Sequence, residues 1–191
     1  ASNAAKSSTC SLVSTKFITD MRVLLTGANG QLGSALCEVF GNETVIPKDL
    51  PDFDLTCPSV EEEIVGSAPD LIIHAGAYTD VDGAEREPDL ALAVNVKGTE
   101  QIARAAVRLG ARLIYISTDY VFDGKQRIPY CENDIPHPIN RYGFSKWRGE
   151  QVVLASGARA LVVRTAWLYG LVGKNFVKSI MRAAQSEPIL K

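Results

Sequence analysis

The sequence has few of the residues that build metal centres or disulfide frameworks. Its 191 residues include two histidines, His74 and His137, which disfavours a histidine-based metal centre. The cysteines show no CxxC spacing and have no histidine nearby, so neither a zinc site nor a disulfide framework is predicted. The four cysteines are Cys10, Cys37, Cys57 and Cys131.

Long apolar runs and an excess of one charge are also missing. The most apolar stretch, residues 160–173, is interrupted by Arg164 and is shorter than the roughly 18 residues that a membrane span needs. The net charge is −2 and the basic residues form no stripe, which argues against nucleic acid or an anionic membrane as a partner. With 46% hydrophobic residues, we expect a cytoplasmic protein with a substantial core.

The two ends of the chain differ from its middle. Ser2-Asn3-Ala4 is typical of a scar left by tag cleavage, and the following Ser- and Thr-rich residues contain no apolar stretch of a secretory signal. We therefore expect residues 1–20 to be a tag remnant and a flexible extension. Residues 188–191 are typical of the onset of a sixth strand. We expect residues 21–191 to form a domain that is truncated near that strand.

Between these ends, short apolar strands alternate with helices. The strands are predicted at residues 22–26, 44–46, 71–75, 112–117 and 161–164. The helices are predicted at residues 32–40, from Ser59 onward with Glu62 completing a capping box, and at 88–110, 142–154 and 175–184. Strands separated by helices imply right-handed crossovers. We predict an α/β fold, a Rossmann-type doubly wound parallel sheet with helices on both faces.

A glycine-rich turn follows the first predicted strand and opens the first helix. Gly27, Gly30 and Gly33 have the spacing G-x-x-G-x-x-G. Glycine lets backbone N–H groups approach a pyrophosphate, and the helix N-terminus adds partial positive charge. Such a turn can also be purely structural, but its place in the first strand–helix unit favours a dinucleotide.

The end of the second predicted strand carries two conflicting signals. Asp49 lies about 20 residues after the turn, where an acidic side chain binds the adenosine ribose of NAD. Lys48 beside it would instead neutralise the 2′-phosphate of NADP. NADPH and NADH therefore both stay open as cofactors.

Tyr142 and Lys146 stand four residues apart on a predicted helix. Residues at this spacing share one helix face. An ammonium there would lower the pKa of the phenol and make its hydroxyl a proton donor near neutral pH. The spacing also occurs by chance, so the rest of the sequence decides its meaning.

Residues 117–124, Ser-Thr-Asp-Tyr-Val-Phe-Asp-Gly, together with Tyr142 and Lys146, resemble the extended short-chain dehydrogenase/reductase superfamily. Within it, the chain is most similar to the dTDP-4-dehydrorhamnose reductases. Further segments support this resemblance: residues 27–33, 74–82, 164–170 and 175–176. The C-terminal third of that family, which completes the substrate pocket, has no counterpart in this sequence.

The resemblance implies a catalytic triad and a reaction. Thr118 would hydrogen-bond a keto oxygen, Tyr142 would protonate it, and Lys146 would lower the pKa of the tyrosine and bind the nicotinamide ribose. The reaction would reduce the 4-keto group of dTDP-4-dehydro-L-rhamnose to dTDP-L-rhamnose with NADPH or NADH.

The resemblance also implies binding residues for cofactor and substrate. Those for the cofactor are Gly27, Asn29, Gly30, Gln31, Leu32, Gly33, Asp49, Asp54, Leu55, Ala75, Gly76, Ala77, Asn95, Tyr142 and Lys146. Those for the nucleotide-sugar substrate are Val81, Thr118 and Trp167. Relatives that bridge a homodimer through magnesium carry Glu where this chain has Ala35, so no such metal site is predicted, while a homodimer itself stays open.

Two other functions compete with the reductase. Tyr120 replaces the Glu of sugar-nucleotide dehydratases, which disfavours elimination, but an epimerase of the same superfamily stays open. So does a non-catalytic regulatory subunit that resembles the one of methionine adenosyltransferase. Among the remaining polar residues, His74 ends a predicted buried strand and is expected to be a core histidine.

Overall fold

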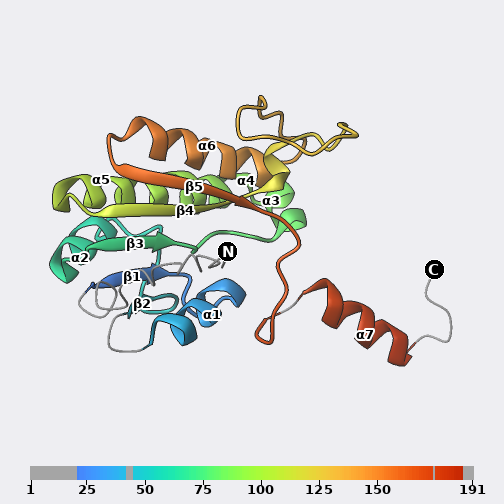
Figure 1. The fold of residues 1–191 in the computed structure, drawn as a ribbon, viewed down its shortest axis with the longest axis horizontal. Coiled ribbons are helices and arrows are strands. Elements are labelled where there is room, and N and C mark those ends of the chain that lie inside the picture. Colours follow the sequence, from blue (N-terminus) through green and yellow to red (C-terminus); the bar gives the residue numbers. More distant parts are fainter. Residues whose placement is uncertain (1–20, 42–44, 174, 187–191) are drawn as a thin grey trace, which may run out of the picture.

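The computed structural model describes residues 21–41, 45–173 and 175–186. The predicted extension at residues 1–20 and the predicted sixth strand at 188–191 lie outside these ranges. Figure 1 shows strands layered with helices. The strands are β1 (Val23–Thr26), β2 (Val45–Lys48), β3 (Leu71–His74), β4 (Arg112–Thr118) and β5 (Arg159–Thr165).

The five strands form one parallel sheet in the order β2-β1-β3-β4-β5. The helices are α1 (Gln31–Phe40), α2 (Val60–Ser67), α3 (Val81–Arg86), α4 (Pro88–Leu92), α5 (Thr99–Leu109), α6 (Arg141–Ala155) and α7 (Phe176–Ser186), with a π-helix η2 (Ala93–Gly98) and a 3-10 helix η3 (Asp119–Val121). The reversal of strand order beside β1 is the doubly wound arrangement predicted from the alternation of strands and helices.

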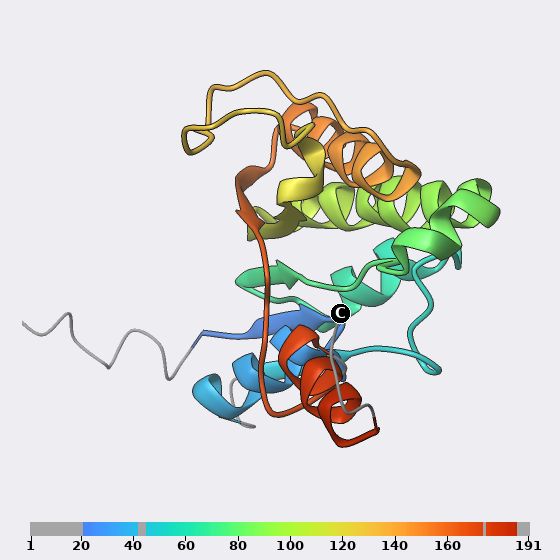
Figure 2. The same ribbon diagram turned by 90° about the vertical axis from the view of Figure 1, so that its right-hand side faces the viewer.

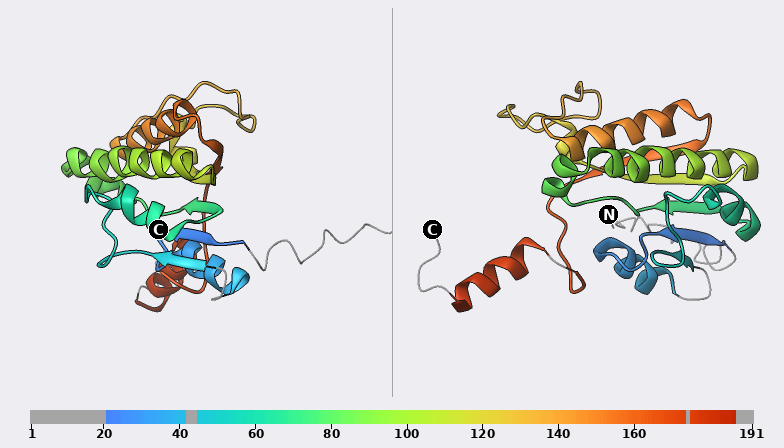
Figure 3. Two further views of the ribbon diagram at one scale, coloured as in Figure 1. Left: turned by 90° about the vertical axis from the view of Figure 1, so that its left-hand side faces the viewer. Right: turned by 180° about the vertical axis from the view of Figure 1, so that it is seen from behind.

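Side chains of β1 alternate between two cores, one on each face of the sheet. Leu24 belongs to the core that α2, α5 and α6 cover. Val23 and Leu25 belong to the core on the other face, where they pack with Leu36 of α1. Figures 2 and 3 show helices on both sides of the sheet. The prediction of helices on both faces is confirmed.

Three local predictions were wrong in detail. Ser59 forms no capping box: its hydroxyl donates to Glu63 Oε1 at 2.8 Å, and its oxygen accepts from no backbone N–H of the helix. The single helix predicted at residues 88–110 is interrupted by η2, whose extra residue per turn a 3.6-residue period does not reveal. Helix α3 was not predicted; it begins at an N-cap, Asp80, whose carboxylate accepts from Gly83 N at 2.9 Å.

The last helix is set apart from the sheet. Helix α7 lies beyond the chain that leaves β5, at some distance from the five strands (Figures 1 and 3). Its large apolar side chains are exposed in this structure, Phe176 to 57% and Met181 to 60%. The site described below is lined by residues of the strands, of α1, α3, η3 and α6 and of the loops between them, and by no residue of α7.

Candidate active site

A cavity of about 800 Å³ opens at the carboxyl ends of the parallel strands. Ligands of open α/β sheets bind at this edge, beside the point where strand order reverses. The predicted residues that line the cavity are Gly27, Asn29, Gly30, Gln31, Leu32, Gly33, Asp49, Ala75, Gly76, Ala77, Val81, Thr118, Tyr142, Lys146 and Trp167. Residues far apart in the sequence thus share one surface.

Two more predicted residues, Asp54 and Leu55, line a smaller hollow of about 90 Å³. Gly27, Asp49 and Gly76 line both spaces, so the hollow adjoins the cavity. Asn95 lines neither of them.

The glycine turn is built by close backbone approach. Gly27 has a φ of +71°, and a Cβ there would lie 2.6 Å from Gly76 N. A Cβ on Gly33 would collide with the carbonyl oxygen of Gly27. Gly30 is the N-cap of α1, so no capping side chain covers the N–H groups of the first turn. The turn therefore presents backbone donors and a helix N-terminus to the cavity.

Asp49 holds this turn from the end of β2. Its carboxylate accepts from Asn29 N at 2.7 Å and from Leu50 N at 2.8 Å. The neighbouring Lys48 places its Nζ 3.8 Å from Glu63 Oε2 and 5.3 Å from the ring centre of Phe53. Both residues line the smaller hollow, so the conflict between an acidic and a basic signal persists in the structure.

Thr118 and Tyr142 meet although they come from different elements. Thr118 ends β4, and Tyr142 lies in the first turn of α6. The N-cap Asn140 fixes the start of that helix by accepting from Gly143 N at 2.7 Å. A Cβ on Gly143 would collide with the carbonyl oxygen of Tyr120, so glycine permits the close approach of α6 to η3. The Thr118 hydroxyl donates to Asp119 Oδ1 at 3.1 Å and accepts from Tyr120 N at 3.2 Å. It also lies close enough to Tyr142 to lower the pKa of that phenol.

Lys146 is buried one turn further along α6. Its Nζ donates to Ile116 O at 2.7 Å and lies 4.2 Å from the centre of the Tyr115 ring. Burial lowers the pKa of Lys146 to about 7, and the charge of Glu150 partly opposes this shift.

The predicted lowering of the Tyr142 pKa by Lys146 is wrong for this structure. Burial raises the pKa of Tyr142, and the nearby Thr118 hydroxyl only partly opposes the rise. Lys146 is not among the causes of the shift. Its ammonium binds the Ile116 carbonyl and lies over Tyr115, so desolvation of the phenol outweighs any attraction.

Asn95 lies behind the cavity, on the π-helix η2. Its amide oxygen accepts from Tyr78 N at 2.8 Å, and its amide nitrogen donates to Tyr78 O and to Ser145 Oγ at 3.0 and 2.9 Å. The side chain therefore links the loop after β3 to α6. It supports residues that line the cavity and does not line it itself.

Two of the three predicted substrate residues, Val81 and Trp167, line the cavity together with Thr118. Val81 is the first residue of α3. Trp167 follows β5 with a φ of 54°, is 73% exposed and meets Phe176 edge-to-face at 5.1 Å between ring centres. Trp167 is therefore not part of the core of the described residues.

His74 is the satisfied core histidine that its position predicts. Thr99 Oγ1 donates to Asn95 O, so it accepts from His74 Nε2 at 3.0 Å. His74 Nδ1 then accepts from the Thr26 hydroxyl at 2.8 Å. Burial lowers the pKa of this imidazole to about 3, so it is neutral at ordinary pH.

Several cavity residues escaped the sequence reasoning. Tyr120 lies edge-on to the Tyr142 ring, with 5.6 Å between ring centres. The others are Thr79, Ile116, Ser117, Asp119, Thr165, Ala166, Leu168 and Gly173. Most of them follow or end a predicted strand, which is the signal that could have found them.

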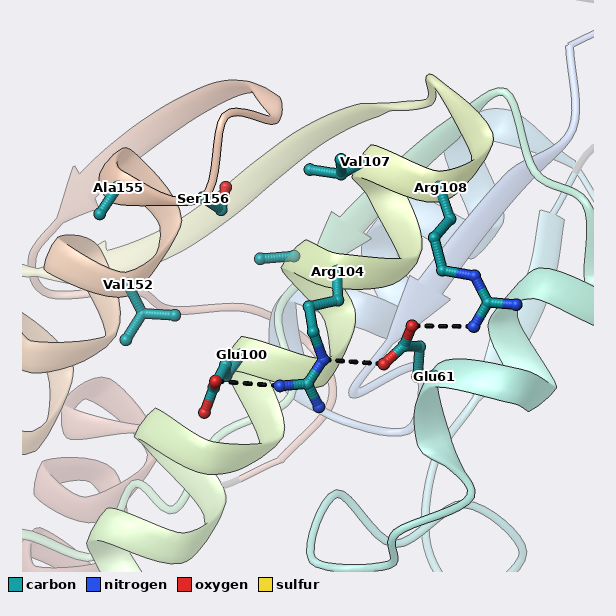
Figure 4. Close-up of a pocket in the computed structure, with 9 residues that line it drawn as sticks. Glu61, Glu100, Arg104, Val107, Arg108, Val152, Ala155 and Ser156 are labelled. Atoms are coloured by element: carbon teal, nitrogen blue, oxygen red, sulfur yellow. Dashed lines mark hydrogen bonds and ion pairs between the residues drawn. The ribbon is translucent and has the colours of Figure 1, made fainter.

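A further hollow lies between α5 and α6, away from the glycine turn (Figure 4). Its charged side chains pair with one another: Arg104 binds Glu61 and Glu100, and Arg108 binds Glu61. None of the predicted site residues lines it. We assign it no part in the chemistry.

Two searches cover only the residues that the structure describes. In that part of the chain no three His, Cys, Asp or Glu side chains gather as metal ligands would. No described helix has both the length and the apolarity to cross a membrane.

Known proteins with sequences similar to this chain include reductases. A dTDP-4-dehydrorhamnose reductase of Sinorhizobium fredii is 44% identical over 168 residues, which are 87% of this chain and 57% of that protein. One from Mycobacterium tuberculosis is 45% identical over 170 residues, 85% of this chain and 56% of the relative. The chain thus spans less than two thirds of these relatives.

Solved structures extend the comparison to the fold. The crystal structure of dTDP-4-dehydrorhamnose reductase from Bacillus anthracis in complex with NADP superposes with a TM-score of 0.83 at 45% identity, covering 87% of this chain and 60% of that one. The family described as RmlD substrate binding domain matches residues 21–191. A match over most of the sequence, joined to the shared fold, shows that the chain belongs to the RmlD substrate binding domain family.

Proposed function

We propose that this chain provides the cofactor site and the catalytic side chains of an NAD(P)H-dependent reductase that converts dTDP-4-dehydro-L-rhamnose to dTDP-L-rhamnose. The observation that carries the proposal is one cavity lined by the glycine turn together with Thr118, Tyr142 and Lys146. The names of the relatives support this substrate, and the NADP complex of the Bacillus anthracis enzyme supports the cofactor.

The residues at the turn fit a dinucleotide. Backbone N–H groups at the start of the ten-residue helix α1 face a pyrophosphate position, with no capping side chain in the way. The cavity volume of about 800 Å³ lies in the range of small-molecule sites. A reduced nicotinamide bound there supplies the hydride for the keto carbon.

Side chains of this protein bind and protonate the keto oxygen of the substrate. Thr118 and Tyr142 line the same cavity, and Thr118 lies close enough to Tyr142 to lower the pKa of the phenol, so one substrate oxygen can reach both hydroxyls. Thr118 donates to that oxygen and Tyr142 delivers the proton that completes the reduction. The raised pKa of Tyr142 keeps its hydroxyl protonated at neutral pH, as a proton donor must be. Lys146 binds the ribose hydroxyls of the cofactor.

The test is turnover by the intact gene product. Purified protein is mixed with dTDP-4-dehydro-L-rhamnose and either NADPH or NADH, and loss of reduced cofactor is followed together with formation of dTDP-L-rhamnose. dTDP-glucose, which lacks a keto group, is the control substrate. Absence of turnover with both cofactors would reject the proposal, and tightly bound NAD with epimerised product would favour the epimerase.

A further inference from the structure

A single carboxylate ties α6 to two strands behind the cavity. Glu150 is fully buried, at 0% exposure. Its Oε1 accepts from Ser117 Oγ at 2.5 Å and from Arg164 Nε at 2.9 Å. Its Oε2 accepts from Arg164 Nη2 at 2.7 Å. Both oxygens are therefore bonded, and they reach β4 through Ser117 and β5 through Arg164.

The two partners of Glu150 lie side by side in the sheet. Ser117 and Arg164 are paired in the register of β4 and β5, and the next pair is Thr118 with Thr165. Thr118 and Thr165 end their strands and line the cavity. The carboxylate thus binds each strand at the residue next to its last one, and on β4 that residue, Ser117, itself lines the cavity.

On its own helix, Glu150 continues the line of site residues. Lys146 precedes it by four positions and Tyr142 by eight, so all three share one face of α6. Bonds made by Glu150 therefore set where this face lies against the ends of β4 and β5.

Stability alone does not account for such a pair. Removing two charges from water costs several kcal/mol, and apolar side chains of similar volume often serve stability as well or better. A bidentate Arg–carboxylate pair does fix geometry in two directions. The contribution of the Glu150–Arg164 pair is therefore the placement of α6 against the strands.

We propose that Glu150 is a positioning residue for the reduction, holding Tyr142 and Lys146 of α6 in place against Thr118 through its bonds to Ser117 and Arg164. The inference rests on the proposed function, because the placement matters for the chemistry assigned there. Glu150 touches neither substrate nor cofactor and acts through its neighbours.

The charge of Glu150 gives a second readout through Lys146. The groups around this ammonium are His74 on β3, Tyr115 on β4 and Glu150 on α6, with Arg164 of β5 behind Glu150. His74 is neutral because its pKa is about 3, and burial raises the pKa of Tyr115 far above neutrality. Glu150 is the group that raises the pKa of Lys146 against burial.

The experiment compares Glu150→Gln with a matched control in the intact gene product. Glu150→Gln keeps the size of the side chain, and we expect kcat to fall about tenfold or more because of misplaced groups. The pH limb that reports Lys146 should move to lower pH, because Glu150 raises the pKa of Lys146. In Glu61→Gln, which also loses two arginine partners but lies outside the cavity, neither quantity should change.

A variant with a shorter acidic side chain separates the effect of side-chain length from the effect of negative charge. Glu150→Asp keeps the negative charge but is one methylene short of Ser117 and Arg164. We expect a reduced kcat with the pH limb near its wild-type position. A kcat and pH profile of Glu150→Gln that match those of Glu61→Gln would overturn the positioning role and leave the proposed function intact.

Two further measurements cover the remaining outcomes. If the wild-type protein shows no turnover, the proposed function fails. In that case the rate of acetylation of Lys146 is measured by mass spectrometry as a function of pH. If the midpoint of this pH dependence in Glu150→Gln is the same as in the wild type, the inference about Glu150 is overturned. If Glu150→Gln does not fold, Ser117→Ala decides: it keeps the ion pair and loses the bond to β4. A several-fold lower kcat supports the inference, and a wild-type kcat overturns it.

Discussion

The ammonium of Lys146 lies 4.2 Å from the centre of the Tyr115 ring, beneath the floor of the cavity. The ring face and the Ile116 carbonyl, 2.7 Å from Nζ, replace the water that a charged lysine would otherwise bind. This replacement is incomplete, since burial lowers the pKa of Lys146 to about 7. The site therefore holds a lysine that changes charge near neutral pH.

Lys146→Met is expected to stabilise the fold at and below neutral pH. The folded pKa is about 7 and the ordinary value is 10.5, so between these values the unfolded chain binds more protons than the folded one. The wild-type free energy of unfolding should then rise with pH across this window by about 1.4 kcal/mol per pH unit. The variant lacks this rise.

Chemical denaturation at several pH values measures the effect. The difference in free energy of unfolding between Lys146→Met and the wild type should be largest below pH 7 and should shrink toward pH 10. Stability curves of the two proteins that run parallel throughout would show that Lys146 carries no burial penalty.

Tyr142→Phe should abolish most of the reductase activity and spare cofactor binding. The change removes the proton donor, a contribution typically worth about 10²- to 10⁴-fold in rate. NADPH affinity, followed by fluorescence titration, should be close to wild type. Tyr130→Phe is the control, because its hydroxyl bonds Asp123 in a loop outside the cavity. Comparable kcat values for the two variants would refute the assigned role of Tyr142.

Lys48→Ala should separate the two cofactors. Lys48 is the one cation among the described residues that line the smaller hollow. Removing Lys48 should weaken the binding of NADPH about tenfold, because the loss of one phosphate contact costs about 1.4 kcal/mol. The affinity for NADH should be nearly unchanged. Lys125→Ala, on the exposed loop beside Asp123, controls for net charge. Equal losses for both cofactors would place the 2′-phosphate away from Lys48.

Gly33→Ala should disrupt both the turn and cofactor binding. The added Cβ collides with the Gly27 carbonyl oxygen, and such overpacking usually costs about 1–3 kcal/mol. Gly66→Ala on α2 is the matched control, since its Cβ would meet nothing within 4 Å and alanine favours a helix. Thermal unfolding and NADPH titration check both variants. A Gly33→Ala protein that binds NADPH normally would contradict the close-packed turn.

The sequence predicted the parts of the fold that depend on local pattern. Buried parallel strands such as residues 71–74 are continuous apolar runs, and their alternation with helices determines the sheet. The glycine turn was predictable because Gly27 and Gly33 are required by backbone contacts. The four-residue spacing of Tyr142 and Lys146 likewise survives in α6, because helical geometry is regular.

The electrostatics of the site were not predictable from spacing. Tyr142 and Lys146 share a helix face, but burial decides the direction in which each pKa shifts, opposed by Thr118 at Tyr142 and by Glu150 at Lys146. These come from tertiary packing, which adjacency along the chain does not encode. For the same reason the sequence does not reveal that the amide of Asn95 bonds Tyr78 and Ser145; its predicted place near the cofactor stays a prediction.

The π-helix that carries Asn95 holds one residue more per turn than an α-helix needs. Deleting a single residue from 93–98 would restore an unbroken α-helical ladder and leave both flanking helices in register. A shortened chain of this kind should unfold at a higher temperature and yet lose the Asn95 bridge between the loop after β3 and α6. The irregular turn thus gives up regular helical hydrogen bonding in exchange for the position of a single amide group.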